Sequence, residues 1–163
     1  MPALKILVVE DFEQFRQLVV STLQQRAEFQ VLGASNGLEA LRKAEEQRPD
    51  LVLLDIGLPG LDGIEVARRL RKLSAPPKIV FVSQESSPEL VREALSLGAL
   101  GYVHKLRAGS DLLPAVEAAL EGRRFVSKGL EGGPATDRTR APHEIFLCPE
   151  EETLLEALLI SLP

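Results

Sequence analysis

The chain has 163 residues, a length that fits one full domain with an appendage and excludes a large multidomain enzyme. Hydrophobic residues make up 45% and charged residues 26%, so the composition is that of a globular chain that can bury a core. The formal net charge of −5 argues against nucleic acid and anionic membranes as default partners. Cys148 is the single cysteine, which excludes an intrachain disulfide and a thiolate zinc cage.

The apolar runs of the chain are short. The first, Ile6 to Val9, is far below the roughly 18 residues that a membrane span requires. Glu10 and Asp11 follow it directly, which makes it unsuitable as the core of a signal peptide. We therefore expect a cytoplasmic protein that does not bind a membrane.

Five short apolar runs each precede a segment with helical periodicity, the pattern of strands and helices that alternate around a parallel sheet. Asn36 and Ser87 have the residue types that begin helices, whereas Gly98 and Gly122 are typical of helix ends. The sequence therefore predicts an α/β domain over residues 1–122, with strands at 4–9, 30–34, 51–54, 78–82 and 101–103.

The remainder of the chain does not continue this pattern. Residues 123–142 lack periodicity and have five Gly or Pro among twenty residues, so we interpret them as a linker. Residues 143–163 form a short acidic tail in which Pro149, three glutamates and a leucine stripe predict one helix. The tail is either that helix alone or the beginning of a further domain.

The predicted strands end in polar residues. Glu10 and Asp11 follow the first strand, Asp55 the third, Ser83 the fourth and Lys105 the fifth. Because the carboxyl ends of parallel strands meet at one edge of a sheet, we expect these side chains to converge.

An all-oxygen cluster of this kind favours a hard divalent cation, and Mg²⁺ is the natural candidate. Carboxylates at 4 Å repel each other by about 4 kcal/mol per pair at an effective dielectric constant near 20, so positive charge is needed among them. Together with the Lys105 ammonium and the Ser83 hydroxyl, the cation would form a cradle for a transferring phosphoryl group. Asp55, between the acidic pair and the lysine, is the best-placed acceptor.

Four segments in order resemble the receiver domain of two-component response regulators, and the resemblance covers about residues 1–122. They are Ile6 to Asp11, Leu53 to Gly63, Ser83, and Gly98 to Lys105. The resemblance implies a doubly wound, flavodoxin-like sheet with strand order 2-1-3-4-5. It also implies that a histidine kinase or phosphotransfer protein donates a phosphoryl group to Asp55.

The resemblance further implies roles for individual residues. Glu10, Asp11, Asp55 and the backbone carbonyl of Gly57 would arrange Mg²⁺, and Ser83 and Lys105 would contact the phosphoryl group. Tyr102 would be the aromatic switch that couples to Ser83. The domain would act as a signalling switch rather than a turnover enzyme, catalysing only its own phosphorylation and dephosphorylation. A homodimer formed through helical faces is a further expectation.

One position departs from the family pattern. Most receivers have a proline after the lysine, whereas Leu106 stands here. Lys105 without that proline, followed later by Gly122 to Ser127, resembles the branch of response regulators with a helix-turn-helix output domain. The tail is too short for a helix-turn-helix, so we expect no nucleic acid to be bound by this chain as given. A fragment of a DNA-binding regulator is therefore the alternative interpretation.

Two other classes of protein fit the sequence less well, and one histidine has a simpler interpretation. An aspartyl-nucleophile phosphatase usually has a second acid two positions after the nucleophile, where this chain has Gly57. A flavodoxin-type cofactor binder needs a phosphate loop after the first strand, where Glu10 and Asp11 would repel a bare phosphate. We expect His104 to be a solvated residue at a strand end.

Overall fold

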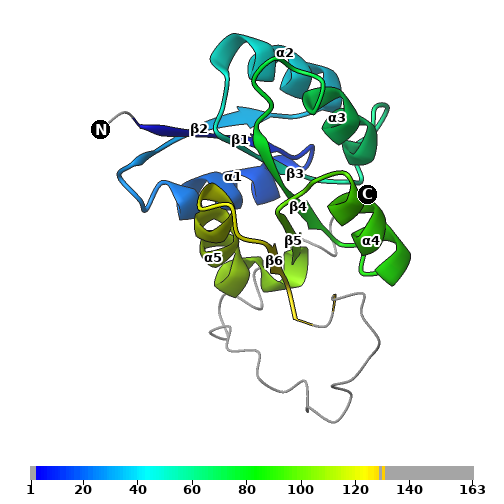
Figure 1. Cartoon of the computed structure of the whole chain (residues 1–163). Coiled ribbons are helices and arrows are strands. Elements are labelled where there is room, and N and C mark those ends of the chain that lie inside the picture. The colour runs from blue at the N-terminus through cyan, green and yellow to red at the C-terminus, as the bar shows by residue number, and fades with distance from the viewer. Residues whose placement is uncertain (1–2, 129, 131–163) are drawn as a thin grey trace.

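The computed structural model describes residues 3–128 and residue 130, so the acidic tail and most of the predicted linker lie outside the described residues. Strands and helices alternate along the described chain (Figure 1). The strands are β1 Leu4–Val9, β2 Phe29–Ala34, β3 Leu51–Leu54, β4 Lys78–Ser83, β5 Gly101–His104 and β6 Phe125–Val126. The helices are α1 Glu13–Leu23, α2 Gly37–Gln47, α3 Gly63–Leu70, α4 Pro88–Ser96 and α5 Ala108–Leu120, with a short 3-10 turn, η1, at Lys105–Arg107.

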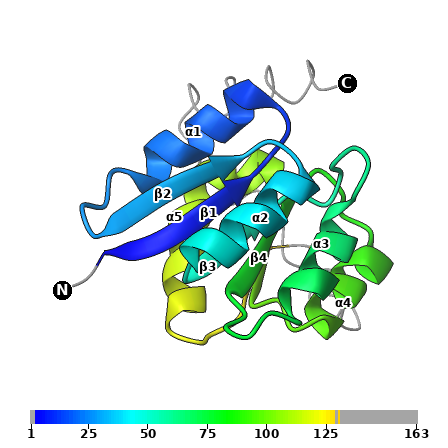
Figure 2. The same ribbon diagram turned by 90° about the horizontal axis from the view of Figure 1, so that it is seen from above.

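All paired strands are parallel and lie in the order β2-β1-β3-β4-β5-β6. The predicted α/β class and the order 2-1-3-4-5 are therefore confirmed. Helices cover both faces of the sheet (Figure 2), with α1 and α5 on one face and α2, α3 and α4 on the other. This arrangement places the carboxyl ends of the strands, and the loops that follow them, at one edge.

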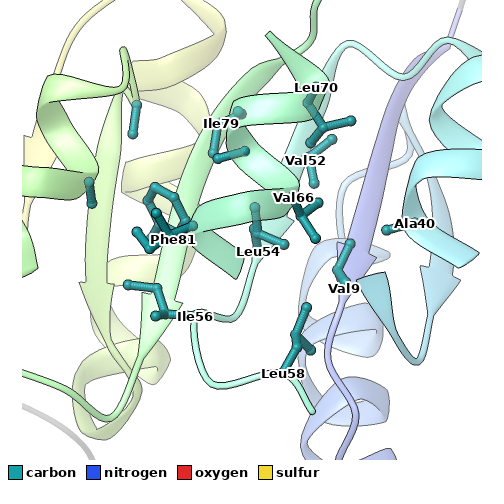
Figure 3. Packing of buried hydrophobic residues seen from close by; sticks show 14 of the residues in the cluster. Val9, Ala40, Val52, Leu54, Ile56, Leu58, Val66, Leu70, Ile79 and Phe81 are labelled. Atoms are coloured by element: carbon teal, nitrogen blue, oxygen red, sulfur yellow. The ribbon is translucent and has the colours of Figure 1, made fainter. Parts of the chain in front are cut away.

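Alternating residues of each strand feed two hydrophobic cores. Leu7 and Val9 of β1 face the α2–α3–α4 side, whereas Ile6 and Val8 face the α1–α5 side. Both sets are almost fully buried, as the two-sided cover of a parallel sheet requires. Figure 3 shows the first core close up, with side chains of β3 and β4 packed against those of α2 and α3.

The sheet has one strand more than predicted, and the sixth lies in the segment interpreted as the start of the linker. Phe125 and Val126 pair in parallel with Gly101 and Tyr102 of β5. A strand of two residues is too short to produce a periodic pattern in the sequence. It forms here because the edge of β5 offers backbone N–H and C=O groups that it can pair with. The sheet therefore extends beyond Gly122, to Val126, and Ser127, which follows it, is fully buried.

Helices α2, α4 and α5 begin or end at the residues that the sequence predicted. The Asn36 side chain accepts a hydrogen bond from the Glu39 N–H at 2.8 Å, and the Ser87 hydroxyl accepts one from the Leu90 N–H at 3.1 Å. Gly98 and Gly122 have φ values of 91° and 80°, the left-handed conformation that ends a helix. No helix in the described part of the chain is long and apolar enough to cross a membrane.

Candidate functional site

Three carboxylates meet at the carboxyl edge of the sheet. Glu10 and Asp11 follow β1, Asp55 follows β3, and one oxygen from each lies within 4.8 Å of the others. Glu10 and Asp55 are 3% and 6% exposed, whereas Asp11 is intermediate. An all-oxygen group of this size suits a hard divalent cation such as Mg²⁺.

A buried lysine completes the cluster. Lys105 follows β5 and is 2% exposed, and its Nζ lies 2.6 Å from Glu10 Oε1 and 3.3 Å from Asp55 Oδ2. The same nitrogen lies 4.9 Å from the centroid of the Phe15 ring, whose face attracts a cation. One ammonium thus compensates two carboxylates out of contact with bulk water.

The second oxygen of each buried carboxylate is also engaged. Glu10 Oε2 accepts a hydrogen bond from the Phe12 N–H at 3.0 Å, and Asp55 Oδ1 accepts one from the Gly57 N–H at 3.2 Å. Burial raises the pKa of Glu10 to about 7, with Asp55 adding to the rise and Lys105 opposing it. Three carboxylates face one lysine here, and this excess of acidic groups favours a bound cation.

Close backbone packing holds Asp55 in place. Its N–H donates to the Val9 carbonyl at 3.1 Å, and the Gly63 N–H donates to the Ile56 carbonyl at 2.9 Å. A Cβ at Gly63 would lie 2.2 Å from the Asp55 carbonyl oxygen and 2.7 Å from Ile56 Cα. Glycine is therefore required where helix α3 begins beside the end of β3.

Ser83 and Tyr102 lie on the neighbouring strands and share a partner. The Ser83 hydroxyl accepts a hydrogen bond from the Glu85 N–H at 3.0 Å, and the Tyr102 hydroxyl donates to the Glu85 carbonyl at 2.9 Å. Tyr102 is fully buried, with its ring centroid 6.3 Å from that of Phe81. Burial raises the pKa of the Tyr102 hydroxyl, and a hydrogen bond with Ser83 opposes the rise.

The structure therefore brings Glu10, Asp11, Asp55 and Lys105 into direct proximity, with Ser83 and Tyr102 linked to each other beside them. Arg16 in the first turns of α1 was not among the predicted site residues, yet its guanidinium donates to the Glu10 backbone carbonyl at 2.7 Å. Its charge and its position one helical turn after Phe12 are ordinary for an exposed helix face, so no sequence signal marked it.

A six-stranded parallel sheet with this strand order, an acidic cluster and a buried lysine at its carboxyl edge is the arrangement of a flavodoxin-like receiver fold. A family model described as the response regulator receiver domain matches residues 6–117. The chain belongs to the response regulator receiver family.

Individual relatives agree with this assignment. A putative transcriptional regulator of Pseudomonas aeruginosa is 40% identical over 119 residues, which cover 72% of this chain and 57% of the relative. The probable transcriptional regulatory protein NarL of Mycobacterium tuberculosis is 34% identical over 157 residues, which cover 94% of this chain and 73% of the relative. The chain thus spans little more than half the length of the Pseudomonas relative.

Solved structures agree as well. The signal receiver domain of the putative response regulator NarL from Mycobacterium tuberculosis has a TM-score of 0.71 and 31% identity, covering 76% of this chain and 100% of that one. A LuxR-family two-component response regulator from Aurantimonas has a TM-score of 0.74 and 31% identity, covering 78% and 92%. The chain therefore carries a receiver domain of the type found in LuxR-family and NarL-type regulators.

Proposed function

We propose that Asp55 accepts a phosphoryl group from the phosphohistidine of a histidine kinase or phosphotransfer protein. The N–P bond of the donor breaks as an O–P bond to an Asp55 carboxylate oxygen forms, and the donor imidazole keeps the bonding electron pair. The observation that carries the proposal is the convergence of Glu10, Asp11 and Asp55 within 4.8 Å beside the buried Lys105. The reaction would modify the domain itself and turn over no external substrate.

The residues around Asp55 fit the demands of this transfer. Glu10, Asp11, Asp55 and the Gly57 carbonyl would hold Mg²⁺, which when bound compensates the charge of the phosphoryl oxygens. The Lys105 ammonium, already 3.3 Å from Asp55 Oδ2, would pair with one of those oxygens. The buried Ser83 hydroxyl would donate a hydrogen bond to another.

Intact mass is the direct test. The protein is incubated with Mg²⁺ and acetyl phosphate, and a gain of one phosphoryl group is expected, which hydroxylamine removes because it cleaves an acyl phosphate. Asp55→Asn and chelation of the metal should each abolish the gain. A wild-type mass that does not change, or a gain that persists in Asp55→Asn, contradicts the proposal.

The link between Ser83, Glu85 and Tyr102 supports a conformational role for the same modification. If the Ser83 hydroxyl turns toward the phosphoryl group, the Glu85 N–H loses its acceptor at 3.0 Å, and the carbonyl that Tyr102 binds moves with it. Phosphorylation would then alter the surface formed by α4, β5 and α5. In Tyr102→Phe, the phosphorylation rate should persist while the phosphorylation-induced NMR shifts of α4 amides shrink. Unchanged shifts would remove Tyr102 from the switch.

The relatives favour one context for this switch. Two of them are named as transcriptional regulators, so we propose that the receiver serves transcriptional control in the cytoplasm. Genomic sequence following residue 163 tests this proposal, and a helix-turn-helix there would support it. A homodimer remains part of the proposal, and sedimentation of the protein with and without the phosphoryl group tests it.

A further inference from the structure

The residue that follows Lys105 has a backbone N–H that a proline would lack. Leu106 occupies this position in the short turn η1, and its N–H donates to Nδ1 of His104 at 3.1 Å. The peptide bonds of the described residues are all trans, including the bond between Lys105 and Leu106. The histidine ring therefore closes a local turn around the lysine.

His104 is itself held from the other side. Its N–H donates to the Ser127 hydroxyl at 3.1 Å, and the Ser127 N–H donates to the Tyr102 carbonyl at 2.9 Å. His104 is half-buried rather than solvated as expected from the sequence. Burial lowers the pKa of His104, a hydrogen bond with the Gln84 backbone opposes this, and Arg107 adds to it. The lowered pKa favours the neutral ring, and its Nδ1 accepts the Leu106 N–H.

A buried carboxylate anchors the arrangement. The Ser127 hydroxyl donates to Asp111 Oδ2 at 2.7 Å, and Arg107 Nε donates to the same oxygen at 3.1 Å. Ser127 is fully buried and Asp111 is 8% exposed, so these bonds are shielded from competing water. His104, the residue before Lys105, is thus bonded to Ser127 after β6. Arg107, two residues after Lys105, is bonded to Asp111 of α5.

We propose that His104, Asp111 and Ser127 form a positioning brace that holds Lys105 over Asp55 in the absence of the proline that most receivers have at position 106. The inference rests on the proposed role of Lys105 in phosphoryl transfer. The lysine side chain must reach Glu10 and Asp55 at once, at 2.6 and 3.3 Å, so both contacts depend on where its backbone is held. The three brace residues touch neither carboxylate, so they act through Lys105.

The brace also gives a function to the residue that follows β6. Because Ser127 bonds both to His104 and to Tyr102, the segment after β6 is connected to the residue before Lys105 and to the aromatic residue of β5. Loss of Ser127 should therefore affect the site although Ser127 is 22 residues beyond Lys105 in the sequence.

Two measurements on His104→Ala and His104→Asn test the brace. Asparagine offers a short acceptor for a backbone N–H two residues on, as in an Asx turn, whereas alanine offers none. The phosphorylation rate with acetyl phosphate should fall about tenfold or more in His104→Ala, because small misplacements of a catalytic group are costly, and should stay within about threefold of wild type in His104→Asn. Ser127→Ala should behave like His104→Ala.

Asn36→Ala is the matched control, since it removes a similar side-chain acceptor of a backbone N–H, at 2.8 Å, beside β2, whereas His104 lies in β5, three strands further along the sheet order after β1. It should leave the phosphorylation rate unchanged while lowering the melting temperature. A general loss of stability would slow the reaction in Asn36→Ala as much as in His104→Ala and would overturn the brace.

The second measurement does not depend on phosphorylation. Lys105 is 2% exposed, so it should resist an amine-reactive label, and peptide mass spectrometry should find it labelled faster in His104→Ala but not in His104→Asn. Protection of Lys105 in His104→Ala, at conditions where the variant is folded, overturns the inference. If wild type accepts no phosphoryl group, the proposed function fails and the labelling pattern alone decides the brace.

Discussion

Lys105 and Glu10 form a buried ion pair, with Nζ 2.6 Å from Oε1 and side chains 2% and 4% exposed. Asp55 lies 3.3 Å from the same nitrogen, so one ammonium joins the ends of β1, β3 and β5. A buried charge that loses its partner is destabilising, whereas an exposed pair contributes little. The lysine thus has a structural role in addition to the one we propose for it in phosphoryl transfer.

Lys105→Met should lower the free energy of unfolding by about 3 kcal/mol at pH 7 without metal, because two buried carboxylates lose their counter-charge. Urea titration measures the loss, and saturating Mg²⁺ should restore part of it. Arg69→Met is the control, since it removes an exposed pair with Glu65 and should therefore cost far less than Lys105→Met. Equal losses in the two variants would contradict this account of the site.

Asp11→Asn should weaken Mg²⁺ binding by tenfold or more, because it removes one of three carboxylates that lie within 4.8 Å. The metal-free protein should be as stable as wild type or more stable, since like charges at this distance repel by roughly 3 kcal/mol at an effective dielectric constant near 20. Isothermal titration and thermal melting give the two quantities. An unchanged affinity would remove Asp11 from the proposed metal site.

The strand order was implied by the resemblance to receiver domains. The meeting of Glu10, Asp55 and Lys105 was predicted from the sequence itself, because each residue follows a buried strand of a parallel sheet. The sequence did not predict β6 or the bonds of His104. The two residues of β6 are too few to show a periodic pattern. A histidine at a strand end is commonly exposed to solvent, so the sequence did not suggest that the His104 ring makes specific bonds. Both depend on contacts between residues distant in sequence, namely Ser127 with His104 and Asp111.

Glu39 provides a prediction about pH. Hydrogen bonding from the Ser35 N–H at 2.8 Å, with help from Lys43, lowers the pKa of Glu39 from 4.5 to about 2. A carboxyl with a lowered pKa stabilises the fold above its unfolded value and loses that contribution as the pH falls toward the folded value. Wild type should therefore exceed Glu39→Gln by about 1 kcal/mol at pH 7, the size of a helix cap at this partly exposed site.

The difference between wild type and Glu39→Gln should begin to shrink below about pH 5 and continue to fall toward pH 2. Urea unfolding at pH 7, 5, 4 and 3.5 measures this trend. A difference that is constant over this range would mean that the Ser35 bond does not depend on the charge of Glu39.

Gly63 and Gly57 differ in what a methyl group would meet, and this difference gives a prediction about Asp55. A Cβ at Gly63 would lie 2.2 Å from the Asp55 carbonyl oxygen, whereas the nearest atom to one at Gly57 is Asp55 Oδ1 at 4.0 Å. Gly63→Ala should therefore displace the backbone at Asp55, cost about 2 kcal/mol or more, and slow phosphorylation in proportion to that displacement.

Gly57→Ala should be tolerated, because its proposed contribution to the metal site is a backbone carbonyl that alanine retains. Chemical denaturation and the rate of mass gain with acetyl phosphate, measured on both variants, separate the two effects. A Gly63→Ala protein that is phosphorylated at the wild-type rate would mean that the close approach of α3 to β3 does not control the position of the acceptor. Slow phosphorylation of Gly57→Ala with unchanged stability would instead point to a narrower steric requirement beside the Asp55 carboxylate.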